Sequence, residues 1–225
     1  MFSPGLTSVL ENTGPFAGNK FTTMDAQQRM EYIRNAKIFI LGSGGLGCEL
    51  LKCLAFNGFK HIDIADMDKV EYSNLNRQFL FRKSDAEQGR YKSQAAAEFI
   101  ANRVRGRFSE EVEINYHTCK IQDLSDDFYK NFDLVIGGLD NNDARVWMST
   151  ELIKIAKLYG KIIPMIDGAT DSWDGTVRVI YPTQTACMGC LRNAFPESKV
   201  TYQACTLVSK PRKPEHCVFY AYQIA

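Results

Sequence analysis

The sequence predicts an α/β fold built on a mostly parallel sheet with helices on both faces. Short, β-branched apolar runs alternate with segments of helical periodicity between residues 36 and 167. A glycine-rich turn, GSGGLG at residues 42–47, joins the first apolar run to the first of these helices. After residue 167 the pattern changes to WDGTVRVIYP, which predicts a short antiparallel extension of the sheet.

The expected elements follow one another in chain order after an irregular arm, rich in Gly, Pro, Thr and Asn, at residues 1–30. Strands are predicted within residues 37–41, 61–68, 111–120, 132–140, 161–168 and 173–182. Helices are predicted within residues 48–59, 89–104 and 144–159. Pro164 indicates an edge or a bulge in its strand, because proline cannot donate a ladder hydrogen bond.

Composition excludes several functional classes. The 225 residues predict one large core plus an appendage, and 27 Lys and Arg against 26 Asp and Glu leave a net charge of +1. Such a balance argues against general electrostatic binding of nucleic acid or of a membrane surface. No apolar stretch approaches the roughly 20 residues of a membrane helix, and the first 20 residues carry no secretory signal, so we expect a cytoplasmic or nuclear protein.

Polar residues at the predicted strand ends suggest a nucleotide site. Glycines 42, 44, 45 and 47 would let the backbone approach a phosphate at a helix N-terminus. Asp66 ends the second strand, where a carboxylate can accept hydrogen bonds from ribose hydroxyls. A tight glycine turn that only packs the helix on the strand is the alternative for the glycines, and a nicotinamide dinucleotide site would explain all of these residues equally well.

The next loop favours a triphosphate. Arg77 and Lys92 could supply fixed cations, and a triphosphate undergoing substitution needs several of them. Asp140 follows the strand at residues 132–140 and is a natural ligand for Mg²⁺. The alternative interpretation makes Asp140 the N-cap of the helix that begins near Asp143.

Seven cysteines in an intracellular chain favour thiol chemistry or metal ligation over disulfides. Cys187 and Cys190 form a CxxC pair, half of the four-ligand set that a structural Zn²⁺ requires. Two reduced thiols without metal remain the alternative. Cys48 and Cys53 lie in the helix after the glycine turn, where packing in the core is expected.

Cys205 lies in a segment without apolar periodicity, so an exposed loop is expected there. Lys210, Arg212 and Lys213 follow it and would favour the thiolate if the fold brings them near. A small buried cysteine is the alternative.

Four segments carry a family resemblance: GSGGLGCELLKCLAFNGF, IADMDKVEYSNLNRQFLFRKSDAEQGRYKSQAAAEFI, GLDNNDAR and IDGATDSWDGTVRVIYP. They resemble the adenylating domain of ubiquitin-activating enzymes and of their bacterial ThiF/MoeB relatives. LENTGPFAG, FYKNF and CTLVSKPRKPEHC resemble, within that family, the branch that activates a modifier of the Nedd (Rub) type. The SUMO-activating branch is the nearest alternative.

The resemblance implies a Rossmann-like fold that uses ATP and Mg²⁺ to adenylate the C-terminal glycine of a ubiquitin-like modifier. It assigns Asp66 to the ribose, Asp140 to Mg²⁺, and Arg77 and Lys92 to phosphate chemistry. The full expected set of ATP-binding residues is Gly42, Gly44, Gly45, Leu46, Gly47, Asp66, Asp68, Asn74, Arg77, Gln78, Lys92, Asp140 and Asn141. Cys205 is implied as the cysteine that forms a thioester before transfer to a conjugating enzyme.

The resemblance also implies a heterodimer with a homologous, inactive subunit. It divides the chain into an arm (1–30), an adenylation domain (31–182), and a CxxC knuckle with the start of a catalytic-cysteine domain (183–225), which is incomplete and leaves half a zinc site. Two other classes stay open: an NAD-dependent oxidoreductase, and an inactive, truncated regulatory partner.

Overall fold

The computed structural model describes residues 22–107, 111–171 and 174–191, together with Pro214, Cys217, Val218 and Ala221. The chain divides into two compact units, Met1–Gly189 and Cys190–Ala225. The sheet and the helices that cover it belong to the first unit. In the described ranges, no helix combines the length and the apolar character needed to cross a membrane.

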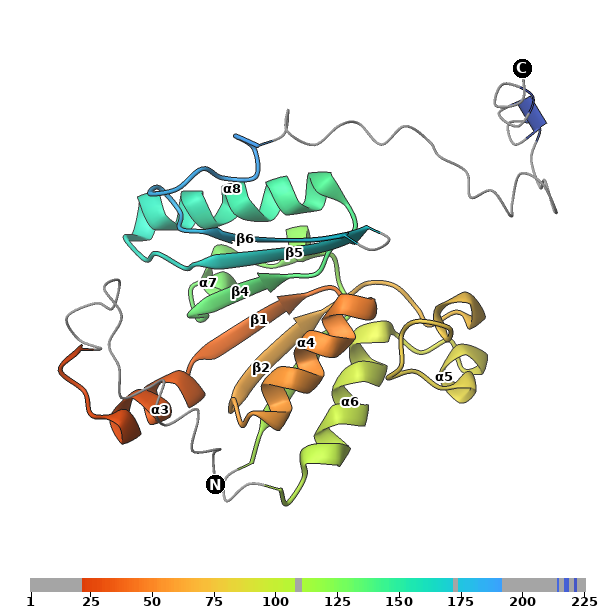
Figure 1. Ribbon diagram of the computed structural model, residues 1–225, viewed down its shortest axis with the longest axis horizontal. Helices are drawn as coiled ribbons and strands as arrows, with labels where there is room; N and C mark the ends of the chain where they lie inside the picture. The colour runs from red at the N-terminus through yellow and green to blue at the C-terminus, as the bar shows by residue number, and fades with distance from the viewer. Residues whose placement is uncertain are drawn as a thin grey trace. The chain divides into compact units, whose positions relative to one another are not determined.

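Six strands form one sheet, shown in Figure 1: β1 (Lys37–Leu41), β2 (His61–Ala65), β3 (Glu113–His117), β4 (Leu134–Gly137), β5 (Met165–Asp171) and β6 (Asp174–Ile180). The helices are α3 (Ala26–Arg34), α4 (Gly45–Phe56), α5 (Lys83–Glu87), α6 (Lys92–Val104), α7 (Asp126–Tyr129) and α8 (Asn142–Tyr159). Two 3₁₀ turns, Tyr72–Asn74 and Ile121–Asp123, lie in the connections.

The strand order is β3-β2-β1-β4-β5-β6, and every neighbouring pair is parallel except β5 and β6. The predicted parallel sheet with an antiparallel extension is therefore confirmed. From β1 the chain first moves outward through β2 and β3, and then returns to place β4 on the other side of β1. The order thus reverses between β1 and β4, and ligands of such sheets bind beyond the carboxyl ends of the strands at this point.

Helices cover both faces because side chains alternate along each strand. Ile38 and Ile40 of β1 are buried in the core that α4 and α6 share with β2. Phe39, between them, stacks on Phe132 and makes edge contacts with Phe128 of α7. In Figure 1, α4 and α6 lie together over one face of β1 and β2.

The structure corrects two expectations from the sequence, one for Pro164 and one for Asp140. Pro164 precedes β5, and its carbonyl accepts a hydrogen bond from Val135 at 3.0 Å, so it forms neither an edge nor a bulge within the strand. The N-cap of α8 is Asn141, whose side chain accepts from the amides of Asp143 and Ala144. The alternative interpretation of Asp140 as that cap is therefore wrong.

Candidate functional site

The glycine turn after β1 requires its glycines for steric reasons. Gly42 has a φ of +88°, a conformation that side chains disfavour. A Cβ on Gly47 would lie 2.0 Å from the Gly42 carbonyl oxygen, whereas one on Gly44 would meet nothing within 4 Å. No side chain caps α4 at Gly44, so the start of this helix presents its backbone N–H groups beside open space.

The loops after β1 and β4 touch each other at the strand-order reversal. Gly138 donates its N–H to Leu41 at 2.9 Å, and a Cβ on Gly42 would lie 3.2 Å from the Gly138 oxygen. The carbonyl of Arg77 lies 3.5 Å from the Cβ position of Gly45. Three loops, residues 42–47, 73–78 and 138–141, therefore meet at one edge of the sheet. Together with Asp66 and Lys92, which lie beside them, they form what we call the strand-end rim.

Asp66 follows β2 directly and lies beside the glycine turn. Its two carboxylate oxygens accept backbone N–H bonds from Ser43 at 2.7 Å and from Asp68 at 2.9 Å. Burial nevertheless raises the pKa of Asp66, because it disfavours the charged form more than these donors favour it. A half-buried carboxylate held by backbone amides is suited to accept hydrogen bonds from hydroxyl groups of a ligand.

Lys92 begins α6, as the sequence predicts, and its ammonium group is held by Asp68 at 2.9 Å. The side chain of Lys92 is mostly buried, while that of Asp68 is 58% exposed. Ser93, next to Lys92, donates its hydroxyl to the carbonyls of Asp66 and His117 and so fixes the helix start against the ends of β2 and β3.

Arg77 is the exposed cation of the loop before α5. Its guanidinium donates to the carbonyl of Ser73 at 3.1 Å and to Asn76 at 3.2 Å, and within the described ranges no carboxylate pairs with it. Asn74 and Gln78 are instead buried. Asn74 accepts the N–H of Glu71 at 2.9 Å, a bond that shapes the 3₁₀ turn.

Asp140 and Asn141 lie on the loop between β4 and α8. Asp140 is exposed and makes no hydrogen bond or ion pair with the part of the chain that the structure describes. An unengaged carboxylate beside a glycine turn fits Mg²⁺, which binds through one or two carboxylates together with substrate phosphates. Asn141 is occupied as the α8 cap.

Comparison with known proteins shows which family the chain belongs to. The ThiF family matches residues 19–211. The chain belongs to the ThiF family. Among curated relatives, the "NEDD8-activating enzyme E1 catalytic subunit" of Caenorhabditis elegans is 44% identical over 86% of this chain and 45% of the relative. The protein of the same name from Dictyostelium discoideum is 40% identical over 96% of this chain and 49% of the relative.

The resemblance inferred from the sequence motifs is thus confirmed. A crystal structure of E. coli MccB with ATP is similar in fold, with a TM-score of 0.56 and 23% identity over 70% of this chain and 44% of MccB. The chain spans about half the length of the curated relatives it matches.

The structure does not describe every predicted site residue of this ThiF-family chain. Cys205 lies outside the described residues, as do Lys210, Arg212 and Lys213. Cys187 is half-buried in the first unit, and Cys190 is exposed in the second. In the described ranges, no group of three or more His, Cys, Asp or Glu residues could hold a metal ion.

Sequence reasoning missed a buried ion pair behind the rim. Arg145 of α8 and Asp167 of β5 are 6% and 3% exposed, and Nε of Arg145 lies 3.6 Å from the Asp167 carboxylate. One signal could have found Asp167: it stands near the carboxyl end of an apolar run, at the same sheet edge as Asp66 and Asp140. Arg145 stands in an ordinary helical pattern that indicates no special role.

The thiols of α4 differ in exposure, which gives a first test of the fold. Cys48 is buried against the Ser43 carbonyl and burial raises its pKa to about 12, whereas Cys53 is exposed, so the expected core position of Cys53 is wrong. Because the thiolate is the reactive form, we expect iodoacetamide at pH 8 to alkylate Cys53 roughly 100-fold faster than Cys48. Peptide mass spectrometry measures both rates, and the denatured chain is the control. Equal rates in the native chain would contradict this packing.

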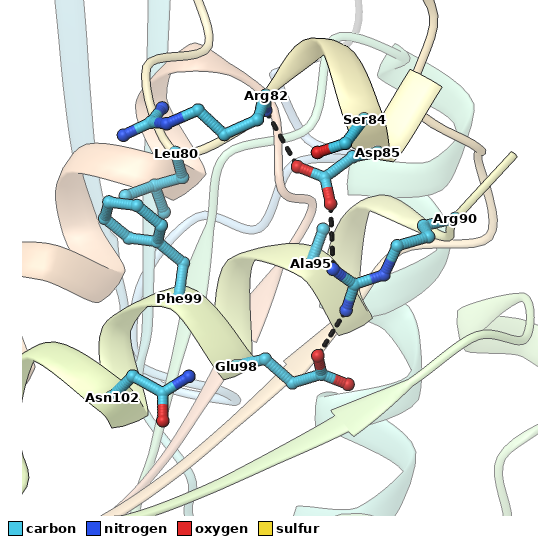
Figure 2. A pocket seen from close by; sticks show the side chains of 9 residues that line it. All are labelled: Leu80, Arg82, Ser84, Asp85, Arg90, Ala95, Glu98, Phe99 and Asn102. Atoms are coloured by element: carbon cyan, nitrogen blue, oxygen red, sulfur yellow. Dashed lines mark hydrogen bonds and ion pairs between the residues drawn. The ribbon is translucent and has the colours of Figure 1, made fainter. Parts of the chain in front are cut away.

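A separate cavity of about 250 Å³ lies between α5 and α6 (Figure 2). Arg90 bridges Asp85, at 2.8 Å, and Glu98 there. Arg82 lies 4.7 Å from the centre of the Phe99 ring and donates to the backbone carbonyls of Phe79 and Phe81. Both acids of the cavity thus pair with Arg90, while the guanidinium of Arg82 is directed to two backbone carbonyls and the Phe99 ring.

Proposed function

We propose that this chain activates a ubiquitin-like modifier of the Nedd (Rub) type. It would adenylate the C-terminal glycine of the modifier with ATP and then carry the modifier as a thioester on Cys205. The observation that best supports the first step is the strand-end rim, where an open helix start, an exposed arginine and an unengaged carboxylate meet at the strand-order reversal. The names of the relatives support the type of modifier.

The first step needs little covalent work from the protein. A carboxylate oxygen of the modifier attacks the α-phosphorus of ATP, the bond from this phosphorus to its bridging oxygen breaks, and pyrophosphate leaves with the electron pair. Such a substitution depends on positioning and on charge stabilisation. The rim supplies groups suited to both tasks.

Each rim group has a proposed task. The open N–H groups at Gly44 and Gly45 would bind phosphate oxygens, and the carboxylate of Asp66 would accept the ribose hydroxyls. Arg77 and Lys92 would bind the phosphates, with Lys92 exchanging its bond to Asp68 for one to ATP. Mg²⁺, held by Asp140, would neutralise phosphate charge when bound. The remaining proposed ATP contacts are Gly42, Leu46, Gly47, Asp68, Asn74, Gln78 and Asn141.

The second step is proposed for Cys205. Its thiolate would attack the acyl carbon of the adenylate, AMP would leave with the electrons of the broken C–O bond, and the thiol proton would pass to solvent. An acyl-adenylate is a strong acyl donor, so this step needs proximity more than a further base. Nearby cations would raise the thiolate fraction.

Several partners belong to the same proposal. They are a homologous, inactive subunit that completes a heterodimer, the modifier itself, and a conjugating enzyme that receives the thioester. We also propose that Cys187 and Cys190 supply two of the four ligands of a structural Zn²⁺. The proposed compartment is the cytoplasm or the nucleus.

Pyrophosphate exchange tests the proposal. With the chain, its partner subunit and a Nedd-type modifier, we expect ATP–pyrophosphate exchange that depends on the modifier. A thioester that reducing agents cleave should also form. Cys205→Ala should abolish the thioester and keep the exchange.

The other outcomes discriminate among the alternatives. If exchange occurs only with a SUMO-type modifier, the proposed Nedd type of modifier is wrong. Binding of a nicotinamide dinucleotide in place of ATP would refute adenylation. Exchange without any thioester would refute the role of Cys205. Absence of exchange from a folded complex would indicate a regulatory partner.

A further inference from the structure

The loop that carries Asp140 has few anchors of its own. Gly138 is tied to Leu41, and Asn141 caps α8, but Asp140 itself contacts nothing polar in the described ranges. The position of its carboxylate therefore depends on the backbone on either side, at Asn141, which the cap fixes, and at Leu139.

Arg145 holds that backbone. It lies in the first turns of α8, and its Nε donates to the Leu139 carbonyl at 2.8 Å while one terminal nitrogen donates to the same oxygen. The other terminal nitrogen lies 3.4 Å from the Asn142 side-chain oxygen. A planar guanidinium that places two donors on one carbonyl restricts the loop more tightly than a single point charge can.

Asp167 forms an ion pair with Arg145. Its Oδ1, which has no hydrogen-bond donor among the described residues, lies 3.6 Å from Nε of Arg145. The same oxygen would lie 2.9 Å from a Cβ on Gly137, so the carboxylate packs directly over the end of β4. Next to Asp167, a Cβ on Gly168 would meet the Leu46 side chain of the glycine turn at 2.9 Å.

Two buried charges are expensive to desolvate unless they are paired, and here the pair lies behind the rim. The end of β4, the first half of β5 and the beginning of α8 all meet at this pair. The glycine turn reaches the same place through Leu46. A change in the pair is therefore transmitted to Leu139 and, through it, to Asp140.

We propose that Arg145 is a positioning residue for the Mg²⁺-binding carboxylate of Asp140 and that Asp167 orients Arg145. This inference rests on the proposed function, because it assigns Asp140 to Mg²⁺. Arg145 does not touch ATP or the metal. It fixes the loop from which Asp140 reaches them.

Arg145→Lys is the variant of choice because it keeps a cation beside Asp167 while it loses the two-donor clamp on Leu139. In the full chain, the binding of a fluorescent ATP analogue is titrated with Mg²⁺ and, separately, measured in EDTA. We expect the Mg²⁺ midpoint to rise about tenfold, the size that lost support of a metal ligand typically produces. Affinity in EDTA should change less than twofold.

Arg34→Lys is the matched control. Arg34 also donates its Nε to a backbone carbonyl, that of Gly58 at 3.0 Å, but it lies before β1, at the opposite end of the sheet. This variant should leave the Mg²⁺ midpoint unchanged. The double variant Arg145→Lys, Asp140→Asn supplies the second readout. If Arg145 acts through Asp140, the Mg²⁺ midpoint of the double variant should equal that of Asp140→Asn, because the carboxylate that Arg145 positions is gone.

The following outcomes would refute the positioning role or the proposed function. An unchanged Mg²⁺ midpoint, or a full tenfold effect on top of Asp140→Asn, would refute the positioning role while ATP binding by the wild type stands. Loss of affinity in EDTA would show a purely structural role. If Arg145→Lys does not fold, Asp167→Asn takes its place, with a smaller rise of the midpoint expected and an unchanged midpoint refuting the inference. A wild type that binds no ATP would overturn the proposed function itself.

Discussion

Gly47→Ala is expected to abolish nucleotide binding and to lower the free energy of unfolding by about 3 kcal/mol, the upper range for an overpacked core. The added Cβ would lie 2.0 Å from the Gly42 oxygen and 2.8 Å from its carbonyl carbon. Both are backbone atoms, so no side chain can turn aside to make room. Instead α4 must move away from the end of β1, which opens the turn that presents the helix start.

Gly45→Ala is the matched control for the steric effect, because it keeps the backbone N–H that is proposed to bind phosphate and adds only a Cβ. Its Cβ would lie 3.5 Å from the Arg77 carbonyl, an ordinary contact, and alanine favours a helix over glycine by up to about 1 kcal/mol. Urea unfolding of the two variants measures stability, and titration with an ATP analogue measures binding. The steric account of the turn fails if Gly47→Ala is as stable as Gly45→Ala and binds the analogue as the wild type does.

Much of the fold follows from periodicity. Fully apolar runs such as Ile38–Leu41 are buried from both sides, as is typical of central strands in a parallel sheet with helices on both faces. Periodicity gives no prediction for residues 192–213, because their sequence has neither the helical nor the strand spacing of apolar residues. The two-unit division falls between Gly189 and Cys190, inside the CxxC motif with which the last segment of the predicted domain division begins.

The positions of the candidate site residues could be predicted where they follow from the end of a parallel strand. Asp66, Lys92 and Asp140 lie at the rim because parallel strands end at the same edge of the sheet. Arg145 and Asp167 escaped prediction because their importance comes from a contact between the beginning of α8 and β5, and this contact depends on how the helix packs against the sheet. Such a pair is visible only after the fold has brought the two charges together.

The second large effect is expected for Arg77→Ala, because Arg77 differs from Lys92 in its charge partners. Lys92 is already neutralised by Asp68, whereas Arg77 has no carboxylate beside it in the described part of the chain. Arg77 is therefore the cation available to meet developing phosphate charge without first breaking an ion pair. We expect Arg77→Ala to slow modifier-dependent ATP–pyrophosphate exchange roughly 10²- to 10³-fold, the size seen when one fixed donor to a transition state is removed.

The free energy of unfolding of Arg77→Ala should stay close to that of the wild type, because the Arg77 side chain is exposed and donates only to Ser73 and Asn76 within its own loop. A change within about 0.5 kcal/mol is expected. Arg103→Ala, which removes an exposed arginine near the far end of α6, should leave both the exchange rate and the stability unchanged. Arg77→Lys should fall between wild type and Arg77→Ala, because lysine keeps the charge but lacks the planar fork. Exchange at the wild-type rate in Arg77→Ala would mean that Lys92 alone supplies the cation, and that its pair with Asp68 opens readily when ATP binds.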